Sequence, residues 1–347
     1  MRTIRREKWG SIVYRPESDE FEAHLAAPGA RPVVDRPISA GILITGRCNL
    51  KCAFCYGDDE SLPKEEITAG EWSKNFARLQ SWGLMRVDIS GGEPTMKRDF
   101  RHIVAAATDL GIATVISTNG LVLKPEQLSG FRDVRWHVSM DSGLEEIHEA
   151  SRQFRVLKPS LGSIEKTSSF LQRCLDLGFP CRVLTCVGNH NREALFALGE
   201  RLALLGVKDW NISKVLRAGR AQSEYERRWQ VSDQSLRDQI QDLRCAFESL
   251  MRIRYSDRTD QNGFFLLALP DGSLATQFTD GRDKVKLGET LQMDLADLQS
   301  SHIFDLAAHG RKWIATTFES SADDGIGAFE LPGAAVVEPY QPSLRVN

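Results

Sequence analysis

The sequence predicts an α/β fold in which a parallel sheet curls into a partial (β/α)6 barrel of the TIM type. Six short apolar runs recur between residues 38 and 215, and helix-like segments separate them: Ile38–Thr45, Met85–Ser90, Ile112–Thr118, Val134–Met140, Arg182–Val187 and Trp210–Val215. Polar motifs follow several of these runs at their carboxyl ends, where β/α barrels carry their functional loops. With 347 residues and 41% hydrophobic content, the chain is long enough to bury such a core.

The barrel is expected to occupy residues 38–221, after a short amino-terminal region at residues 1–37. That region has two alternating runs around a turn, Trp9–Tyr14 and Phe21–Leu25, which predict a β-hairpin. We expect the hairpin to pack against the barrel. Capture of a peptide strand by the hairpin is the alternative.

Residues 222–320 are expected to form a smaller α+β extension. The charged segment 222–253 has apolar residues at helical spacing, a hairpin is predicted around Pro270-Asp271-Gly272, and a second helix over Asp294–Ala308. Residues 321–347, which include several Gly, Ala and Pro, predict a tail.

Charge and hydropathy narrow the function classes. The chain has 44 basic and 47 acidic residues, a net charge of -3 with no block of like charge, so nucleic acid is not indicated as a partner. No apolar run reaches the length of a membrane span, and the first residues lack the apolar region of a signal peptide. These features predict a cytoplasmic protein without membrane association.

The most informative stretch follows the first predicted strand. Three of the seven cysteines, Cys48, Cys52 and Cys55, fall within eight residues, a spacing that favours metal ligation over a disulfide framework. Three thiolates can hold three irons of a [4Fe-4S] cubane and leave the fourth iron open. A zinc site or unligated buried thiols are the alternatives, but zinc needs four ligands, and no His or further Cys lies within thirty residues of Cys55.

The Cys-x3-Cys-x2-Cys spacing, with the aromatic Phe54 before the last Cys, resembles the signature of the radical S-adenosylmethionine (SAM) enzymes. The resemblance implies that the open iron chelates SAM, and that one electron from the cluster cleaves SAM to methionine and a 5'-deoxyadenosyl radical, which takes a hydrogen atom from substrate. It implies one [4Fe-4S] cluster and SAM as cofactors, and an external electron donor of the flavodoxin or ferredoxin type.

Further motifs extend the resemblance to a SAM site. Gly91-Gly92-Glu93-Pro94 follows the second strand and is similar to the family motif that holds the amino group of SAM. The fourth strand alternates, so Ser139 and Asp141 should face the lumen. The resemblance assigns SAM binding to Phe54, Tyr56, Gly91, Gly92, Glu93, Ser139, Arg152 and Asn189. It identifies no catalytic acid or base.

The end of the sixth strand and the extension resemble the subgroup that carries a SPASM or twitch extension. The shared features are Gly219-Arg220-Ala221 and the Pro-Asp-Gly turn, but residues 246–347 contain no cysteine and so cannot bind an auxiliary cluster through thiolates. The subgroup resemblance favours modification of a ribosomally synthesised peptide. Viperin-like radical chemistry on a nucleotide or other small molecule is the alternative, and a non-catalytic SAM- or cluster-binding protein is a third.

Overall fold

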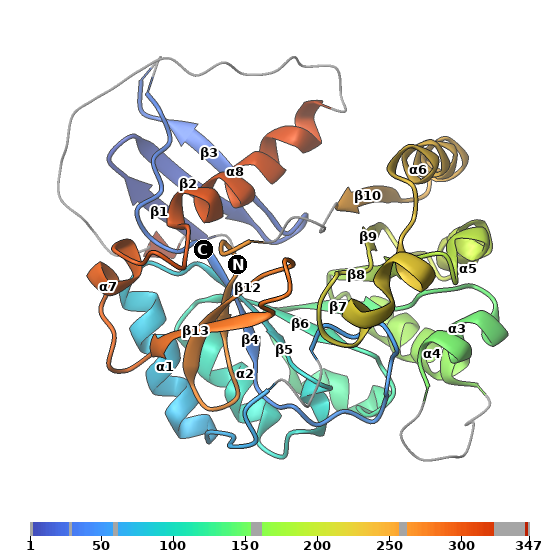
Figure 1. Cartoon of the computed structure of the whole chain (residues 1–347), viewed down its shortest axis with the longest axis horizontal. Coiled ribbons are helices and arrows are strands. Elements are labelled where there is room, and N and C mark those ends of the chain that lie inside the picture. Colours follow the sequence, from blue (N-terminus) through green and yellow to red (C-terminus); the bar gives the residue numbers. More distant parts are fainter. Residues whose placement is uncertain are drawn as a thin grey trace.

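A ten-stranded sheet forms the centre of the molecule, and a four-stranded sheet lies at one end of it (Figure 1). The computed structural model describes residues 3–27, 30–57, 62–153, 162–256, 262–322 and 344–345. The strand order of the large sheet is β10-β9-β8-β7-β6-β5-β4-β11-β12-β13, and that of the small sheet is β14-β1-β2-β3.

Six strands of the large sheet are the six that the sequence predicts. They are β4 (Ser39–Leu43), β5 (Arg86–Ser90), β6 (Ala113–Thr118), β7 (Val134–Ser139), β8 (Cys181–Val187) and β9 (Asp209–Lys214). Each pairs in parallel with the next in sequence. The predicted α/β class with a central parallel sheet is therefore confirmed.

Helices cover the outer face of these strands. They are α1 (Ala69–Ser81), α2 (Phe100–Asp109), α3 (Glu145–Ser151), α4 (Ser163–Asp176) and α5 (Leu195–Leu204). The alternation of β7 sends Trp136 outward, where its ring meets Phe170 of α4 edge to face at 5.4 Å. Helix α1 begins at a capping box, because the Glu71 N–H donates to Thr68 Oγ1 and the Glu71 carboxylate accepts from the Thr68 N–H.

The sheet extends beyond the predicted strands at both edges. Helix α6 (Asp233–Phe247) is followed by β10 (Arg252–Ser256), which pairs with β9, so the helical interpretation of residues 222–253 is wrong at its end. Strand β10 was missed because its alternation of charged and apolar residues covers only five residues, Arg252–Ser256, and its charges are paired only in the folded chain: Arg254 donates to Asp209 and to Glu20. Charged edge strands of this kind are hard to recognise from sequence.

On the opposite edge, the extension continues the same sheet. The predicted hairpin is present as β11 (Leu266–Ala268), which lies parallel to β4, and β12 (Ser273–Gln277). Strand β13 (Lys284–Glu289) then pairs with β12 and was not predicted. The predicted helix 294–308 is two helices, α7 (Leu295–Gln299) and α8 (Leu306–Ala322).

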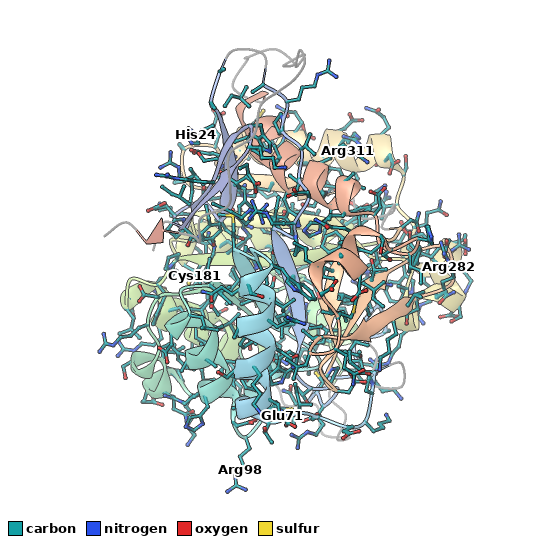
Figure 2. The ribbon with its side chains drawn as sticks, turned by 90° about the vertical axis from the view of Figure 1, so that its left-hand side faces the viewer. His24, Glu71, Arg98, Cys181, Arg282 and Arg311 are labelled. Carbon is teal, nitrogen blue, oxygen red and sulfur yellow. The ribbon has the colours of Figure 1, made fainter. Side chains whose placement is uncertain are left out.

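The small sheet is a meander of β1 (Thr3–Glu7), β2 (Gly10–Arg15) and β3 (Glu20–Leu25), joined by β14 (Leu344–Arg345). The predicted hairpin is β2–β3, and β1 is an additional strand. Helix α8 packs beside the meander, where Trp313 meets Phe21 edge to face at 5.6 Å. Figure 2 shows the meander with His24 and helix α8 with Arg311 at one end of the molecule, and Glu71 toward the other. Of the predicted tail, residues 321–322 end helix α8 and residues 344–345 form β14, and the rest lies outside the described residues.

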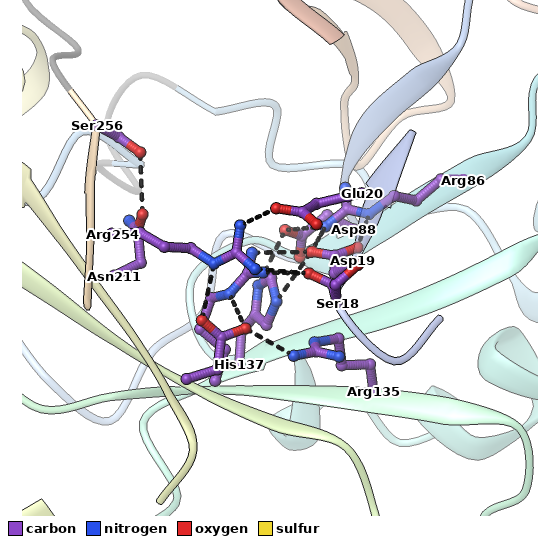
Figure 3. A network of polar contacts seen from close by, with 12 residues as sticks. Ser18, Asp19, Glu20, Arg86, Asp88, Arg135, His137, Asn211, Arg254 and Ser256 are labelled. Carbon is purple, nitrogen blue, oxygen red and sulfur yellow. Dashed lines mark hydrogen bonds and ion pairs between the residues drawn. The ribbon is translucent and has the colours of Figure 1, made fainter. Parts of the chain in front are cut away.

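The turn between β2 and β3 is tied to the amino ends of the barrel strands by a buried polar network (Figure 3). Asp19 accepts hydrogen bonds from Arg86 Nε at 2.6 Å and from Arg182 Nη1 at 3.0 Å, and His137 Nε2 lies 3.3 Å from its Oδ2. Burial opposes ionisation of Asp19, but Arg86, His137 and Arg182 outweigh it and hold the pKa of Asp19 well below its usual range. The turn therefore packs against the barrel as expected, while peptide capture by the hairpin stays a prediction.

Candidate functional site

The three cysteines lie on the loop that leaves the carboxyl end of β4. Cys48, Cys52 and Cys55 are partly exposed, and none is in a disulfide. Burial raises the pKa of the Cys52 thiol, and Cys55 and Cys48 raise it further. The Leu50 N–H donates to Cys48 Sγ at 3.3 Å, a contact of the type that tunes iron–sulfur clusters.

This donor set fits a cubane. Among the residues that the structure describes, no three His, Cys, Asp or Glu side chains converge as they would around a single metal ion. A cubane is held differently, because each thiolate binds a different iron. Three neighbouring thiols on one loop, with an N–H aimed at one sulfur, match that requirement.

The cysteine loop is held in place by backbone contacts to distant elements. The Arg220 N–H donates to the Cys55 carbonyl at 3.0 Å, and Arg220 Nη1 donates to the Cys52 carbonyl at 3.2 Å. From β13, Lys284 Nζ donates to the Tyr56 carbonyl at 2.8 Å. The end of the barrel and the extension therefore both position the segment that carries the thiols.

The Gly-Gly-Glu-Pro motif docks directly on the cysteine loop. The Gly92 N–H donates to the Thr45 carbonyl at 2.7 Å, and the Glu93 N–H donates to the Arg47 carbonyl at 2.8 Å. Gly91 has φ 134°, and a Cβ at Gly92 would lie 2.2 Å from the Arg47 oxygen. A side chain at either position is excluded, so the glycines are required for this close approach of two backbones.

Glu93 binds the next loop of the barrel. Its buried carboxylate accepts from Thr118 Oγ1 at 2.7 Å and from the Asn119 N–H at 2.8 Å. Asn119 Nδ2 in turn donates to Asn49 Oδ1 at 2.8 Å. Burial raises the pKa of Glu93, and these hydrogen bonds oppose that rise. Glu93 thus joins the loops after β5 and β6 to the cysteine loop.

Arg152 is buried and paired at the same end of the barrel. Its Nε donates to Asp141 Oδ2 at 2.6 Å, and its guanidinium lies 5.8 Å from the centre of the Phe54 ring. Burial alone would lower the pKa of Arg152, but Asp141 outweighs it and raises that pKa above its usual value. Asp141 also accepts from the Cys186 N–H at 2.9 Å. The sequence placed Asp141 on the lumen face but gave it no role.

The loop after β8 differs from expectation in which asparagine it buries. Asn189 lies in an exposed turn. Asn191 is buried instead, and its Nδ2 donates to the carbonyls of Asp141, at 2.8 Å, and Cys186, at 3.0 Å. Asn191 was not singled out in the sequence, because its burial is set only by the fold.

The two predicted aromatic residues occupy different surroundings. Phe54 is buried, stacks on His190 at 5.5 Å and meets Trp229 edge to face at 5.9 Å. Tyr56 instead lines an internal cavity of about 220 Å³. His190 and Trp229 were not singled out in the sequence, because neither belongs to a recognisable motif.

The cavity lies on the inner face of the sheet, and side chains from β4 to β9 and from the extension line it. Its polar lining includes Asp88, Ser90, Ser117, Ser139, Arg152, Cys186 and Gln277. Cys186 and Leu184 thus form the lumen face of β8. Of the residues assigned to SAM, the cavity brings together Tyr56, Ser139 and Arg152.

Residues 42–202 match the model of the Radical SAM superfamily, the stretch that carries both the cysteine loop and the Gly-Gly-Glu-Pro motif. The chain contains a radical SAM domain. Two curated relatives are similar to part of the chain. The PqqA peptide cyclase of Bradyrhizobium diazoefficiens is 35% identical over 113 residues, 32% of this chain and 30% of the relative. The AdoMet-dependent heme synthase of Methanosarcina barkeri is 29% identical over 187 residues, 53% of this chain and 52% of the relative. The chain therefore spans about half or less of these relatives.

The radical SAM chain also resembles a solved structure along most of its length. Streptococcus suis SuiB, crystallised with S-adenosylmethionine, has a TM-score of 0.67 and 13% identity, over 87% of this chain and 88% of SuiB. At this identity the likeness shows a shared fold. In the described part of the chain, no helix is both long and apolar enough to cross a membrane.

Proposed function

We propose that this chain is a radical SAM enzyme that modifies a ribosomally synthesised peptide. Cys48, Cys52 and Cys55 would hold one [4Fe-4S] cluster. Bound there with SAM, the cluster supplies one-electron cleavage of SAM to methionine and a 5'-deoxyadenosyl radical, which takes a hydrogen atom from the substrate. The electron would come from an external donor of the flavodoxin or ferredoxin type.

The observation that carries this proposal is the direct docking of the two motifs. Gly92 and Glu93 donate their N–H groups to the backbone just before Cys48, so the thiols and the glycine loop form one unit. The protein's contribution is orientation. Glu93 fixes the loops around the thiols, and Asp141 holds Arg152 as a buried cation suited to a carboxylate such as that of SAM.

The remaining SAM contacts are proposed from the family resemblance. Ser139 and Tyr56 line the cavity beside Arg152, which supports their assignment. Phe54 contacts Arg152 by a cation–π interaction, because the guanidinium lies over the ring, 5.8 Å from its centre. We keep Asn189 as the residue that contacts the ribose of SAM, as the family motif assigns it. The asparagine that contacts Asp141 is the buried Asn191.

A peptide is the preferred substrate because one of the relatives is named as a peptide cyclase. A nucleotide or other small molecule is the second candidate, which the relative named as a heme synthase supports. A reducing compartment such as the cytoplasm would suit the thiolates and the cluster.

The test is reductive cleavage of SAM by the protein after anaerobic reconstitution with iron and sulfide. We expect release of 5'-deoxyadenosine from the reduced protein, and none above background from the Cys52→Ala variant. The Cys245→Ala variant is the matched control, because Cys245 is exposed on α6, outside the cysteine loop, and should retain activity. Absence of 5'-deoxyadenosine from iron-loaded protein would favour a non-catalytic binding role.

A further inference from the structure

The internal cavity contains two hydrogen-bond acceptors that the fold leaves available. Asp88, on β5, accepts from Ser117 Oγ at 2.7 Å through Oδ1. Its Oδ2 lies 3.8 Å from Arg86 and 3.8 Å from His137, which is too far for a hydrogen bond. About a quarter of the Asp88 side chain, 26%, is accessible. Among the described residues, Oδ2 therefore forms only these two longer ion-pair contacts and accepts no hydrogen bond.

Gln277 supplies the second acceptor from β12 of the extension. The side chain is 2% exposed, and its Nε2 donates to the Phe278 carbonyl at 2.8 Å and to Asp283 Oδ1 at 3.0 Å. Because both of these partners are acceptors, the amide cannot be turned over without losing them. The buried Oε1 has no hydrogen-bond partner among the described residues. Buried acceptors are rarely left unpaired, so this oxygen points to a ligand.

The two arginines that line the cavity both have carboxylate partners at hydrogen-bond distance, and Arg86 also forms a longer ion pair with Asp88. Arg86 is bound to Asp19, and Arg152 is bound to Asp141. The opposite wall is apolar and includes Leu184, Leu267 and Trp313. A complementary group would have N–H donors and a positive charge at the end of a flexible alkyl stem.

We propose that the cavity receives a lysine-like side chain of the substrate, whose ammonium group binds Asp88 and Gln277 Oε1. This inference rests on the proposed function and specifies its substrate class. The alkyl stem lies along the apolar wall, and the ammonium donates to the two acceptors. The extension therefore takes part in substrate selection through Gln277, although residues 246–347 contain no cysteine that could bind a cluster.

The test is a binding titration of the full-length, anaerobically reconstituted protein with two matched probes, N-acetyl-lysine methylamide and N-acetyl-norleucine methylamide. The probes differ only in the terminal amine. We expect the lysine probe to bind about 10- to 100-fold more tightly, the range for a hydrogen bond to a charged group. In Asp88→Asn this preference should disappear, and in Gln277→Leu it should fall several-fold.

The matched control is Asp280→Asn, which removes an exposed carboxylate of the extension that pairs with Arg282 outside the cavity lining. It should keep the full preference for lysine. Equal binding of the two probes, no binding of either, or an unchanged preference in both cavity variants would overturn the inference. The titration needs no turnover, so 5'-deoxyadenosine release from the same preparation reports separately on the proposed function.

Discussion

At the scale of single residues, buried charges are compensated at both ends of the barrel. Arg152 and Asp141 pair at the end that carries the thiols, and Asp19 binds Arg86 and Arg182 at the other. Isolated charges are costly to bury, so removing one partner leaves the others uncompensated. Such residues are therefore sensitive positions for stability.

Replacing Asp19 tests this directly. Asp19 has φ 55°, a conformation that Asn also tolerates, so Asp19→Asn removes the charge with little backbone strain. We expect a loss of about 3 kcal/mol in unfolding free energy, as for other broken buried ion pairs, measured by urea denaturation.

The control is Glu22→Gln on the neighbouring strand β3. Glu22 pairs with Arg15 in a partly exposed position, and such surface pairs contribute about 0–1 kcal/mol. Equal effects of the two substitutions would show that the Asp19 network does not anchor the turn.

At the scale of elements, His309 joins helix α8 to the barrel. Its Nε2 accepts from the Ile38 N–H at 3.0 Å, and its Nδ1 lies 2.9 Å from the Phe264 carbonyl. With one nitrogen accepting, the ring must be neutral and carry its proton on Nδ1. Burial lowers the pKa of His309 to about 4, so the folded state resists protonation.

The stability of the chain should therefore fall on mild acidification. The folded pKa lies below the unfolded value of about 6.5, so below that pH the unfolded chain binds the proton first. The contribution of His309 is complete above pH 6.5 and is lost as the pH falls toward 4. We expect a loss of about 2 kcal/mol between pH 7 and pH 5 from this residue.

Urea titrations at the two pH values measure this loss. The loss of unfolding free energy between pH 7 and pH 5 should be smaller in His309→Asn. It should be unchanged in His24→Asn, because His24 is exposed. His148 is buried, and its pKa is also lowered to about 4. Part of the pH-dependent loss should therefore remain in His309→Asn. If the loss between pH 7 and pH 5 were the same in His309→Asn as in the unchanged protein, the neutral His309 imidazole would not be the cause of the pH dependence.

At the scale of the whole molecule, the sequence was informative where the determinants are local. The central strands alternate in polarity, and the cysteine loop and Gly-Gly-Glu-Pro follow them within a few residues, so both were predictable. The charged edge strands were not, because the partners of Arg254 on β10 lie 45 residues away, in Asp209, and 234 residues away, in Glu20.

The lining of the cavity was only partly predictable for the same reason. Alternation along β5 indicates that Asp88 shares a face with Arg86, but not that one of its oxygens forms only longer contacts. Gln277 comes from the extension and reaches the cavity only because β11 pairs with β4. Such a residue has no local signature, since its environment is made by strands far apart in the sequence.

The central claim is that this chain holds one cluster through three cysteines. Iron and sulfide counting after anaerobic reconstitution of the full chain tests it most directly. The account predicts about four irons and four sulfides per chain, and almost none in the Cys48→Ala variant. Stoichiometric zinc with no iron, or about eight irons per chain, would contradict it.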